Sequence, residues 1–271
     1  MNNRIQRFFG QSWHICPDAI EPFLLSVARD STEEESGPMA KRPAHDRYGD
    51  SIPALEMTDD GIAIVPVHGA MVKGATGSDK YRYGVTSHSD IEDDLDESLA
   101  RGARAILLDI NSPGGTVAGT PELAAKVDKI GGVVDIYSFN GQLSASAAEY
   151  FSAGVSARFG VRSSINGSIG TILQTLDISK MLDMMGVTVN VFASGKYKGT
   201  GNPVKPMTDD QREYVQSLVK KMGGEFKDHM QMHRPLQDEH LQGQVFTGQQ
   251  ALDIGLLDQI VSSRAEVLSL I

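Results

Sequence analysis

An apolar run, GIAIVPV at residues 61–67, begins the part of the chain that sets the fold class. A second run, AILLDI at 105–110, and a third, VVDIYS at 133–138, follow it, and the segments between them have the apolar spacing of amphipathic helices. Apolar runs with few interruptions are typical of strands that are buried on both faces. The pattern therefore predicts an α/β fold in which helices cover both faces of a mainly parallel sheet.

Helix starts are marked where serine or threonine is followed three residues later by glutamate or glutamine, which is the capping-box pattern. The pairs that fit it are Ser89 with Glu92, Thr208 with Gln211, and Thr247 with Gln250. The helix after Thr208 is long, and its apolar spacing predicts a buried stripe of Val215, Leu218, Val219, Met222 and Phe226. The segment at 187–192 alternates as a strand does.

The composition limits the classes of partner. With 25 lysines and arginines against 35 aspartates and glutamates, the 271 residues carry a formal charge of −10. A surface of that sign repels phosphate backbones and anionic lipid, so we predict neither a nucleic acid nor a membrane as a partner. The single cysteine, Cys16, cannot form an intramolecular disulfide, and the apolar stretch at 23–27 is far shorter than the ~20 residues that span a bilayer. A cytoplasmic location is expected.

Three segments of the chain differ in composition. Residues 1–28 mix aromatic and aliphatic side chains, and we interpret them as an N-terminal arm. Residues 29–60 are polar and contain several prolines and consecutive glutamates, a composition that favours a flexible linker. Residues 61–271 are predicted to form the domain that carries the function.

A glycine-rich loop, NSPGG at 111–115, comes directly after the second predicted strand. Open α/β sheets place their active sites at such strand ends. Gly114 and Gly115 can point backbone N–H groups at a ligand, as an oxyanion hole requires. A Pro-Gly-Gly turn is more often structural, so this loop alone leaves both interpretations open.

A serine-containing turn, QLSASAAEY at 142–150, leads from the third strand into a helix. Ser146 at this turn is either an N-cap or a nucleophile that gains from the positive end of the helix dipole. If it is a nucleophile, the N–H of Ala147 is placed to join Gly114 in stabilising an oxyanion.

A nucleophilic serine needs a base, and the loop SGKYKGT at 194–200 offers Lys196 and Lys198. Lysines in a loop are usually solvated surface charges. A lysine that its surroundings desolvate can nevertheless lose its proton near neutral pH and act as a base.

Histidine is the other common base, and no histidine occurs between His88 and His229. Nothing in the sequence therefore positions a Ser-His-Asp triad. His229 and His233 stand four residues apart on a helix, but they have no clear third ligand, so neither a metal nor another cofactor is predicted.

Taken in this order, the motifs resemble those of the signal peptide peptidase A family of serine–lysine proteases, and in particular its phage branch of head-maturation or capsid-assembly proteases. The resemblance runs from about residue 61 to residue 261. It implies that GSIG at 167–170 supplies a serine that orients the base. The roles that it implies are Gly114 and Gly115 as oxyanion donors, Ser146 rather than Ser144 as the nucleophile, Lys198 rather than Lys196 as the base, and Ser168 as the residue that orients it.

The same resemblance implies a Clp protease/crotonase type of α/β spiral, which often assembles into homo-oligomeric rings. Two features depart from the family pattern, because Ala147-Ala148 replaces a glycine pair and Glu149 replaces a tyrosine. We expect the Glu149 carboxylate to alter the substrate groove. The family's membrane anchor is missing, which favours the phage branch.

The function that follows is that of a serine endopeptidase which processes capsid or scaffold proteins through an acyl-enzyme. The substrate is expected to add as a strand beside the Gly114 loop. The alternatives are a cytoplasmic protease of the signal peptide peptidase type that degrades peptides, acyl-CoA chemistry on the same fold, and a non-catalytic scaffolding component of an assembling particle.

Overall fold

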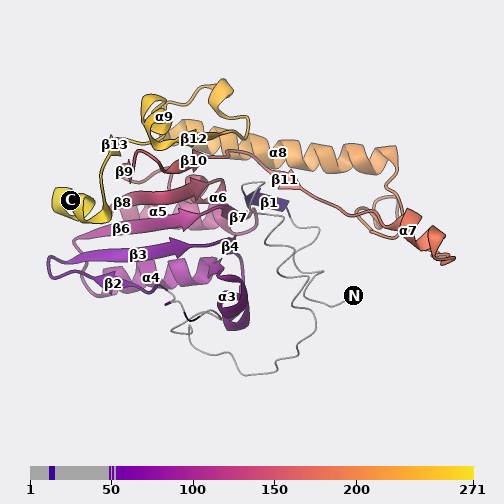
Figure 1. Cartoon of the computed structure of the whole chain (residues 1–271), viewed down its shortest axis with the longest axis horizontal. Coiled ribbons are helices and arrows are strands. Elements are labelled where there is room, and N and C mark those ends of the chain that lie inside the picture. Colours follow the sequence, from indigo (N-terminus) through magenta and orange to yellow (C-terminus); the bar gives the residue numbers. More distant parts are fainter. Residues whose placement is uncertain (1–11, 16–48, 50, 52) are drawn as a thin grey trace.

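The main sheet is largely parallel, as predicted. The computed structural model describes residues 12–15, 49, 51 and 53–271 (Figure 1). Strand order in the main sheet is β12-β10-β8-β6-β3-β2, with β9 beside β8 and β13 beside β9, and only β2 and β12 pair antiparallel with their neighbours. Its strands are β2 (Glu56–Met57), β3 (Ile62–His68), β6 (Ala105–Ser112), β8 (Asp135–Ala145), β9 (Ala157–Gly160), β10 (Ile165–Gly167), β12 (Val245–Thr247) and β13 (Gln259–Ile260).

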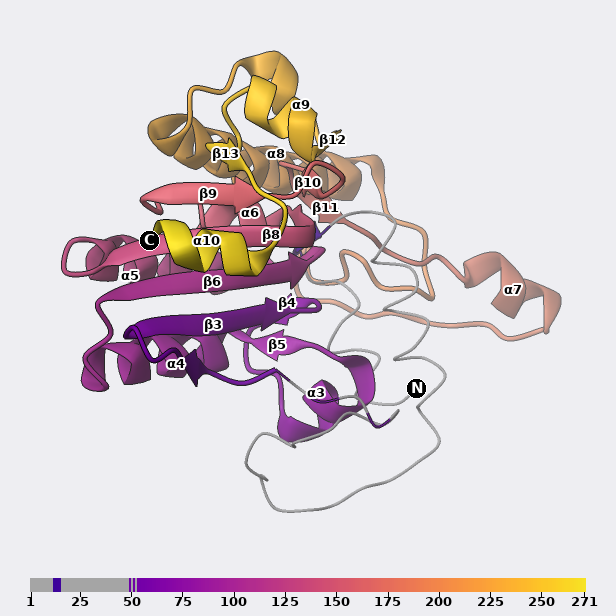
Figure 2. The same cartoon turned by 60° about the vertical axis from the view of Figure 1, so that its left-hand side comes forward.

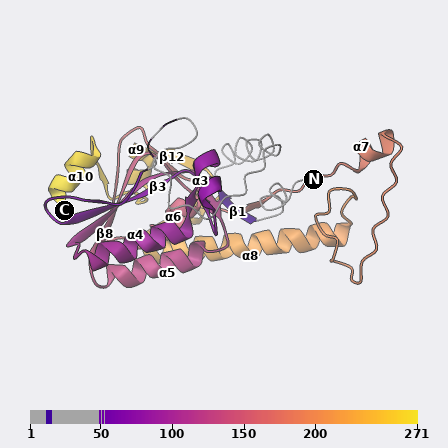
Figure 3. The same cartoon turned by 90° about the horizontal axis from the view of Figure 1, so that it is seen from below.

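Helices cover both faces of this sheet, which also confirms the prediction. Figure 3 shows α4, α5 and α8 together on one side, and Figure 2 shows α10 in front of the strands on the other side. The helices are α3 (Gly77–Tyr83), α4 (His88–Ala100), α5 (Thr120–Gly131), α6 (Ala147–Phe151), α7 (Ser179–Met184), α8 (Asp209–His233), α9 (Gly248–Asp253) and α10 (Arg264–Leu270), with a 3₁₀ turn at Asp238–His240.

The apolar runs are continuous because each strand packs on both faces. In β3, Val65 and Val67 belong to the larger core cluster, which α4, α5, α6 and α8 complete, whereas Ile62 belongs to the smaller cluster with Val267 of α10. Pro66 is tolerated in β3 because β2 pairs only with residues 63–64, so the outer edge of β3 is not bonded to β2 at the proline.

A second sheet lies beside the carboxyl ends of the main strands. Its order is β11-β1-β7-β4-β5, with β1 (Ser12–Ile15), β4 (Met71–Val72), β5 (Thr86–Ser87), β7 (Gly114–Thr116) and β11 (Ile172–Leu173). Gly115 is required by close approach, since a Cβ there would stand 1.8 Å from the carbonyl oxygen of Met71.

The predicted arm and linker fall mostly outside the described residues. Of residues 1–28, only 12–15 are described, and they form β1 in the second sheet. Of residues 29–60, the described part includes β2, which pairs with β3. No helix in the described part of the chain is both long enough and apolar enough to cross a membrane.

Three details of the sequence prediction are corrected. Residues 187–192 form no strand, and α4 begins at His88 with Ser87 as its N-cap, so Ser89 and Glu92 make no capping box. The capping boxes at Thr208 and Thr247 are present. Of the predicted stripe in α8 only Phe226 is fully buried; Val215, Val219 and Met222 are half-buried, and Leu218 is exposed.

The corrections at 187–192 and in α8 share a physical cause. Residues 174–207, which we call the projecting segment, and the first turns of α8 extend beyond the sheet, as Figures 1 and 3 show. An alternating apolar pattern needs a partner strand, and an apolar helix stripe needs a surface to cover it. The described residues of one chain supply neither at this place.

Candidate active site

Ser146 occupies a sharp, strained turn between β8 and α6. Its backbone angles are φ 56° and ψ −112°. Among the described residues other than glycine, only Ser146 and Ser168 have a positive φ. Such a conformation costs on the order of 1–3 kcal/mol and persists only where the surrounding structure imposes it, which happens most often at functional sites.

The side chain of Ser146 does not cap the helix. Although Ser146 stands at the N-cap position of α6, it makes no side-chain cap hydrogen bond, and its buried Oγ has no hydrogen-bond partner among the described residues. The N-cap interpretation therefore does not account for this serine. Ser144 lies two residues earlier inside β8, in regular strand conformation.

Ser168 lies next to Ser146 through the backbone. The N–H of Ser146 donates to the carbonyl of Gly167 over 2.7 Å, and Gly167 is in register with Ala145 in the parallel β8–β10 pair. The N–H of Ser168 donates in turn to the carbonyl of Gln244, also over 2.7 Å. Two strained serines are thus fixed side by side, each by one short backbone hydrogen bond.

The Gly114 loop reaches the same edge of the sheet. Ser112 at the end of β6 is in register with Ser144 of β8, and its Oγ accepts a hydrogen bond from the Gly114 N–H over 3.2 Å. Because β6, β8 and β10 are parallel, their carboxyl ends lie at one edge. The structure therefore brings together four of the predicted site residues, Gly114, Ser146, Ala147 and Ser168, with Gly115 next to Gly114 in β7.

Lys198 does not join them within one chain. Its loop is held against the first turns of α8, where the ring of Tyr197 lies 4.9 Å from that of Tyr214, and Lys198 itself is exposed. By contrast, α6 packs against the later turns, where Tyr150 contacts Phe226 at 5.0 Å between ring centroids. At 1.5 Å per residue, these two places are separated by roughly 20 Å along the helix.

Two other lysines, missed by the sequence analysis, lie near Ser168. A cleft of about 370 Å³ extends from Ser168 between the segment at 169–172 and α8, and Lys220 and Lys227 line it. The adjacent Gly223 and Gly224 of α8 also line the cleft. Helical spacing could have found these lysines, because seven residues are close to two turns and place them on one face.

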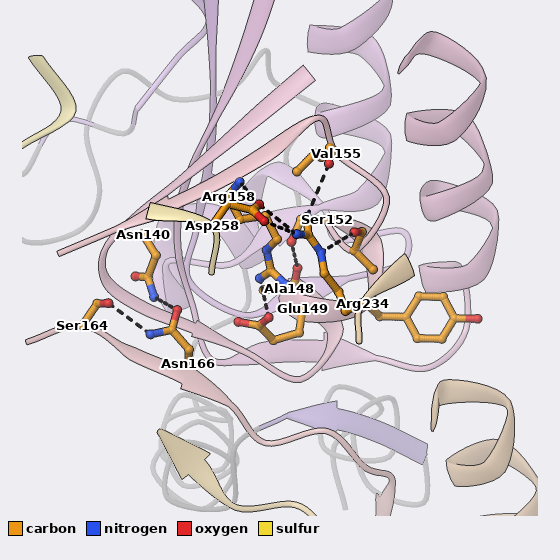
Figure 4. Close-up of polar contacts among 12 residues, drawn as sticks. Asn140, Ala148, Glu149, Ser152, Val155, Arg158, Ser164, Asn166, Arg234 and Asp258 are labelled. Atoms are coloured by element: carbon orange, nitrogen blue, oxygen red, sulfur yellow. Dashed lines mark hydrogen bonds and ion pairs between the residues drawn. The ribbon is translucent and has the colours of Figure 1, made fainter. Parts of the chain in front are cut away.

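Glu149 does not face the substrate groove, contrary to expectation. It is fully buried and its Oε2 pairs with Nη2 of Arg158 in β9, which is 1% exposed (Figure 4). Arg158 was not singled out by the sequence, because an arginine inside a short strand has no local pattern that announces burial. The ion pair joins α6, three residues after Ser146, to the main sheet.

A second ion pair, between the buried Arg234 and the exposed Asp258, lies beside the first. Arg234 donates through Nη1 to both oxygens of Asp258 over 2.9 and 2.8 Å (Figure 4). Its Nε donates to the carbonyl of Ala153 over 3.0 Å. Asp258 also accepts from the backbone N–H of Arg158 over 2.8 Å. Burial, and then the charge of Arg158, lower the pKa of the Arg234 guanidinium. The loop after α6 is thereby tied to β9.

The paired histidines of α8 have a structural environment. His229 stacks on Tyr150 at 4.1 Å, and its Nε2 lies 2.9 Å from the Tyr150 carbonyl oxygen. Burial lowers the pKa of His229, which favours the neutral ring. No group of three or more histidine, cysteine, aspartate or glutamate side chains suited to a metal ion occurs among residues that the structure describes.

Comparisons with known proteins agree with the motifs. The model of peptidase family S49 matches residues 133–270. The capsid assembly protease C of Escherichia phage lambda is 28% identical over 208 residues, which cover 75% of this chain and 47% of that protein. The head-tail preconnector protein GP5 of Enterobacteria phage P21 is 27% identical over 208 residues, 75% of this chain and 41% of that protein. A putative protease of Methanocaldococcus jannaschii is 30% identical over 183 residues, 66% of this chain and 57% of that protein.

The chain thus spans about half the length of the curated relatives it matches. Among solved structures, a ClpP1 mutant from Listeria monocytogenes is similar with a TM-score of 0.49 at 12% identity, covering 76% of this chain and 94% of that one.

The buried ion pair gives a stability prediction. Replacing Glu149→Leu leaves the Arg158 guanidinium buried without its carboxylate, so the free energy of unfolding should fall by about 3–5 kcal/mol, measured by urea denaturation. The double variant Glu149→Leu/Arg158→Met removes both charges and should recover much of that loss.

The matched control is Glu97→Gln, whose partner Arg101 is half exposed; this change should alter the free energy of unfolding by about 0–1 kcal/mol. Strictly additive losses in the Glu149/Arg158 double variant would contradict an energetic coupling between the two residues.

Proposed function

The chain belongs to peptidase family S49, and we propose on that basis that it is a serine endopeptidase that cleaves peptide bonds through an acyl-enzyme on Ser146. The observation that carries the proposal is the turn at Ser146. A positive-φ serine whose buried hydroxyl has no hydrogen-bond partner among the described residues stands between the Gly114 loop and Ser168. Strained strand-to-helix turns of this kind expose nucleophilic serines in other hydrolases.

In the proposed mechanism, the Oγ of Ser146 attacks the scissile carbonyl carbon while a neutral lysine amine takes its proton. The N–H groups of Gly114, Gly115 and Ala147 are the proposed donors to the oxyanion, and the Gly114 N–H must leave the Oγ of Ser112 to take this role. Ser168 orients the lysine amine through its hydroxyl. The protonated lysine then gives its proton to the departing amine, and a water molecule hydrolyses the acyl-enzyme with the same lysine as base.

The base in this proposal is Lys198 from a second copy of the chain. Within one chain Lys198 is exposed and lies roughly 20 Å along α8 from the place where α6 packs, so it cannot serve its own Ser146 in this arrangement. The cleft that begins at Ser168 is the opening through which another copy's lysine can enter.

Exposed apolar side chains support such an assembly. Met184 and Phe192 of the projecting segment are 83% and 94% exposed, and the alternating residues 187–192 have no strand partner among the described residues. Apolar surface of this extent is typical of a protein–protein interface. We therefore propose a homo-oligomer in which projecting segments contact neighbouring copies.

For the substrate we propose the structural proteins of an assembling phage particle, in the host cytoplasm. The two phage relatives, a capsid assembly protease and a head-tail preconnector protein, each align with 75% of this chain. Degradation of unfolded peptides, as in a protease of the signal peptide peptidase type, is the alternative within the same chemistry.

The dyad is tested with four single variants acting on unfolded casein. Ser146→Ala and Lys198→Ala should each lower peptide release by at least about a thousandfold. Lys220→Ala and Lys227→Ala, the lysines of the cleft, are the matched controls and should retain activity. Parent activity should rise with pH as the amine loses its proton, and a serine-directed covalent probe should label the parent but not Ser146→Ala.

If Lys198→Ala kept full activity while Lys227→Ala or Lys220→Ala lost it, the role of base would be assigned to that cleft lysine instead of Lys198. Casein left intact and Ser146 left unlabelled by the probe would favour a scaffolding role, and acyl-CoA turnover by the parent would favour the related hydrolase chemistry.

Assembly of the site from two copies predicts complementation. Mixing equal amounts of Ser146→Ala and Lys198→Ala subunits, after dissociation and reassembly, should restore roughly a quarter of the parent activity, because about one site in four receives both an intact serine and an intact lysine. The control mixes Ser146→Ala with the double variant Ser146→Ala/Lys198→Ala, which should stay silent. Activity that never returns in the first mixture would contradict the exchange of lysines between copies.

A further inference from the structure

Strand β1 lies between two strands that carry the candidate active site. It pairs antiparallel with β7 on one side, where Ile15 is in register with Gly114, and antiparallel with β11 on the other side, where Trp13 is in register with Ile172. β7 begins at the proposed oxyanion donor, and β11 follows the Ser168 turn by four residues. Both neighbours of β1 are therefore parts of the catalytic edge.

Without β1, the strands β7 and β11 would face each other across a slot one strand wide. Two interstrand spacings make about 9–10 Å, which is the width that one extended peptide fills with backbone hydrogen bonds on both sides. The backbone hydrogen bonds that β7 and β11 offer would suit an extended peptide of another molecule as well as residues 12–15. The slot is thus a strand-addition site that this chain fills with its own residues.

The direction of β1 matches that of an acyl donor. β1 runs from Ser12, opposite Leu173, to Ile15, opposite Gly114, so its carboxyl end points toward the oxyanion loop and the Ser168 turn. A peptide attacked by Ser146 must enter in this sense, since the carbonyl that becomes the acyl-enzyme lies at the carboxyl end of the bound strand. Residues 12–15 therefore lie as the residues before a scissile bond would lie.

Trp13 anchors the strand. Its side chain is 1% exposed and is the largest of the fully buried side chains of the described residues. A subsite that takes a large aromatic side chain accounts for this burial.

We propose that β1 is an internal competitor: residues 12–15 occupy the acyl-side half of the peptide-binding slot, with Trp13 in an aromatic subsite, and a substrate peptide must displace them. This inference rests on the proposed protease function for its catalytic meaning. A tethered strand competes at an effective concentration on the order of millimolar, so displacement sets a threshold for weakly bound peptides. Substrates with a large aromatic residue at the Trp13 position are the ones that compete best.

Trp13 is the chain's only tryptophan, so its fluorescence reports on β1 directly. The experiment uses the Ser146→Ala variant of the 271-residue chain, which binds without turnover, and a fluorescein-labelled peptide with residues 10–15 of this chain carrying Trp13→Phe. Peptide binding, read as fluorescence anisotropy, should be accompanied by a red shift of the tryptophan emission with the same midpoint. Binding without any change in the emission would overturn the proposal, because β1 would then be a permanent strand.

A reversible lock gives the second test. Ser12 and Leu173 are directly opposite in an antiparallel pair, where Cα atoms stand about 4.5–5.5 Å apart, within the reach of a disulfide. In a Cys16→Ser background, oxidised Ser12→Cys/Leu173→Cys should lose at least about 90% of casein cleavage, and dithiothreitol should restore it. Each single cysteine variant, oxidised in the same way, is the control and should be unaffected.

Weakening the anchor should have the opposite effect. Trp13→Ala should lower KM for a peptide substrate by about tenfold, since a lost aromatic contact of about 1.4 kcal/mol corresponds to that factor. A locked protein that cleaves casein as fast as its reduced form would refute the competitor role while leaving the protease function intact. A parent that never cleaves casein would count against the protease function alone, because the emission shift needs no turnover.

Discussion

The hydrogen bond from the Ser146 N–H to the Gly167 carbonyl, 2.7 Å long, is the contact on which the candidate site depends. It ties the turn after β8 to the turn after β10. The serines at these turns have positive φ angles, which are unfavourable unless the surrounding structure imposes them. The register between β6 and β8 then fixes the Gly114 loop, which follows β6, beside these two turns. Parallel pairing of three strands therefore brings Gly114, Ser146 and Ser168, the proposed oxyanion donor, nucleophile and orienting residue, to one edge although they lie far apart in sequence.

Behind that edge, buried charges add to the apolar packing of α6. The helix α6 is only five residues long, too short to be stable by its own hydrogen bonds. Glu149 pairs with Arg158 of β9. The loop after the helix accepts from Arg234, whose partner Asp258 also accepts from the Arg158 N–H. Directional contacts of this kind fix the orientation of a helix more narrowly than an apolar surface does, because an unpaired buried charge is strongly unfavourable.

Sequence periodicity predicted the strands at 61–67 and 105–110 because a strand buried on both faces is apolar at nearly every residue. The same reasoning failed at 187–192. An alternating pattern shows that one face of a segment is apolar, but it does not show which surface covers that face. Motif order brought Ser146, Ser168 and Gly114 into one hypothesis, and the fold places them together. It could not place Lys198, because the path of a long loop is set by contacts with α8. Nor could it place Glu149 or β1, whose environments arise from residues far away in sequence.

Two features of the proposed site, the position of Lys198 and the occupation of the peptide slot by β1, have the same consequence for a single chain. The proposed base, Lys198, is held on a segment that projects away from Ser146, and the proposed slot for the acyl side of a peptide is filled by the chain's own β1. If both proposals hold, an isolated subunit is inactive for two independent reasons, one removed by assembly and the other by a peptide that outcompetes a tethered strand. The proposed role among the proteins of an assembling particle would require such restraint, since free subunits would meet those proteins before the particle is built. The two restraints also select differently, because assembly decides when cleavage begins, whereas competition with Trp13 decides which extended segments are cleaved.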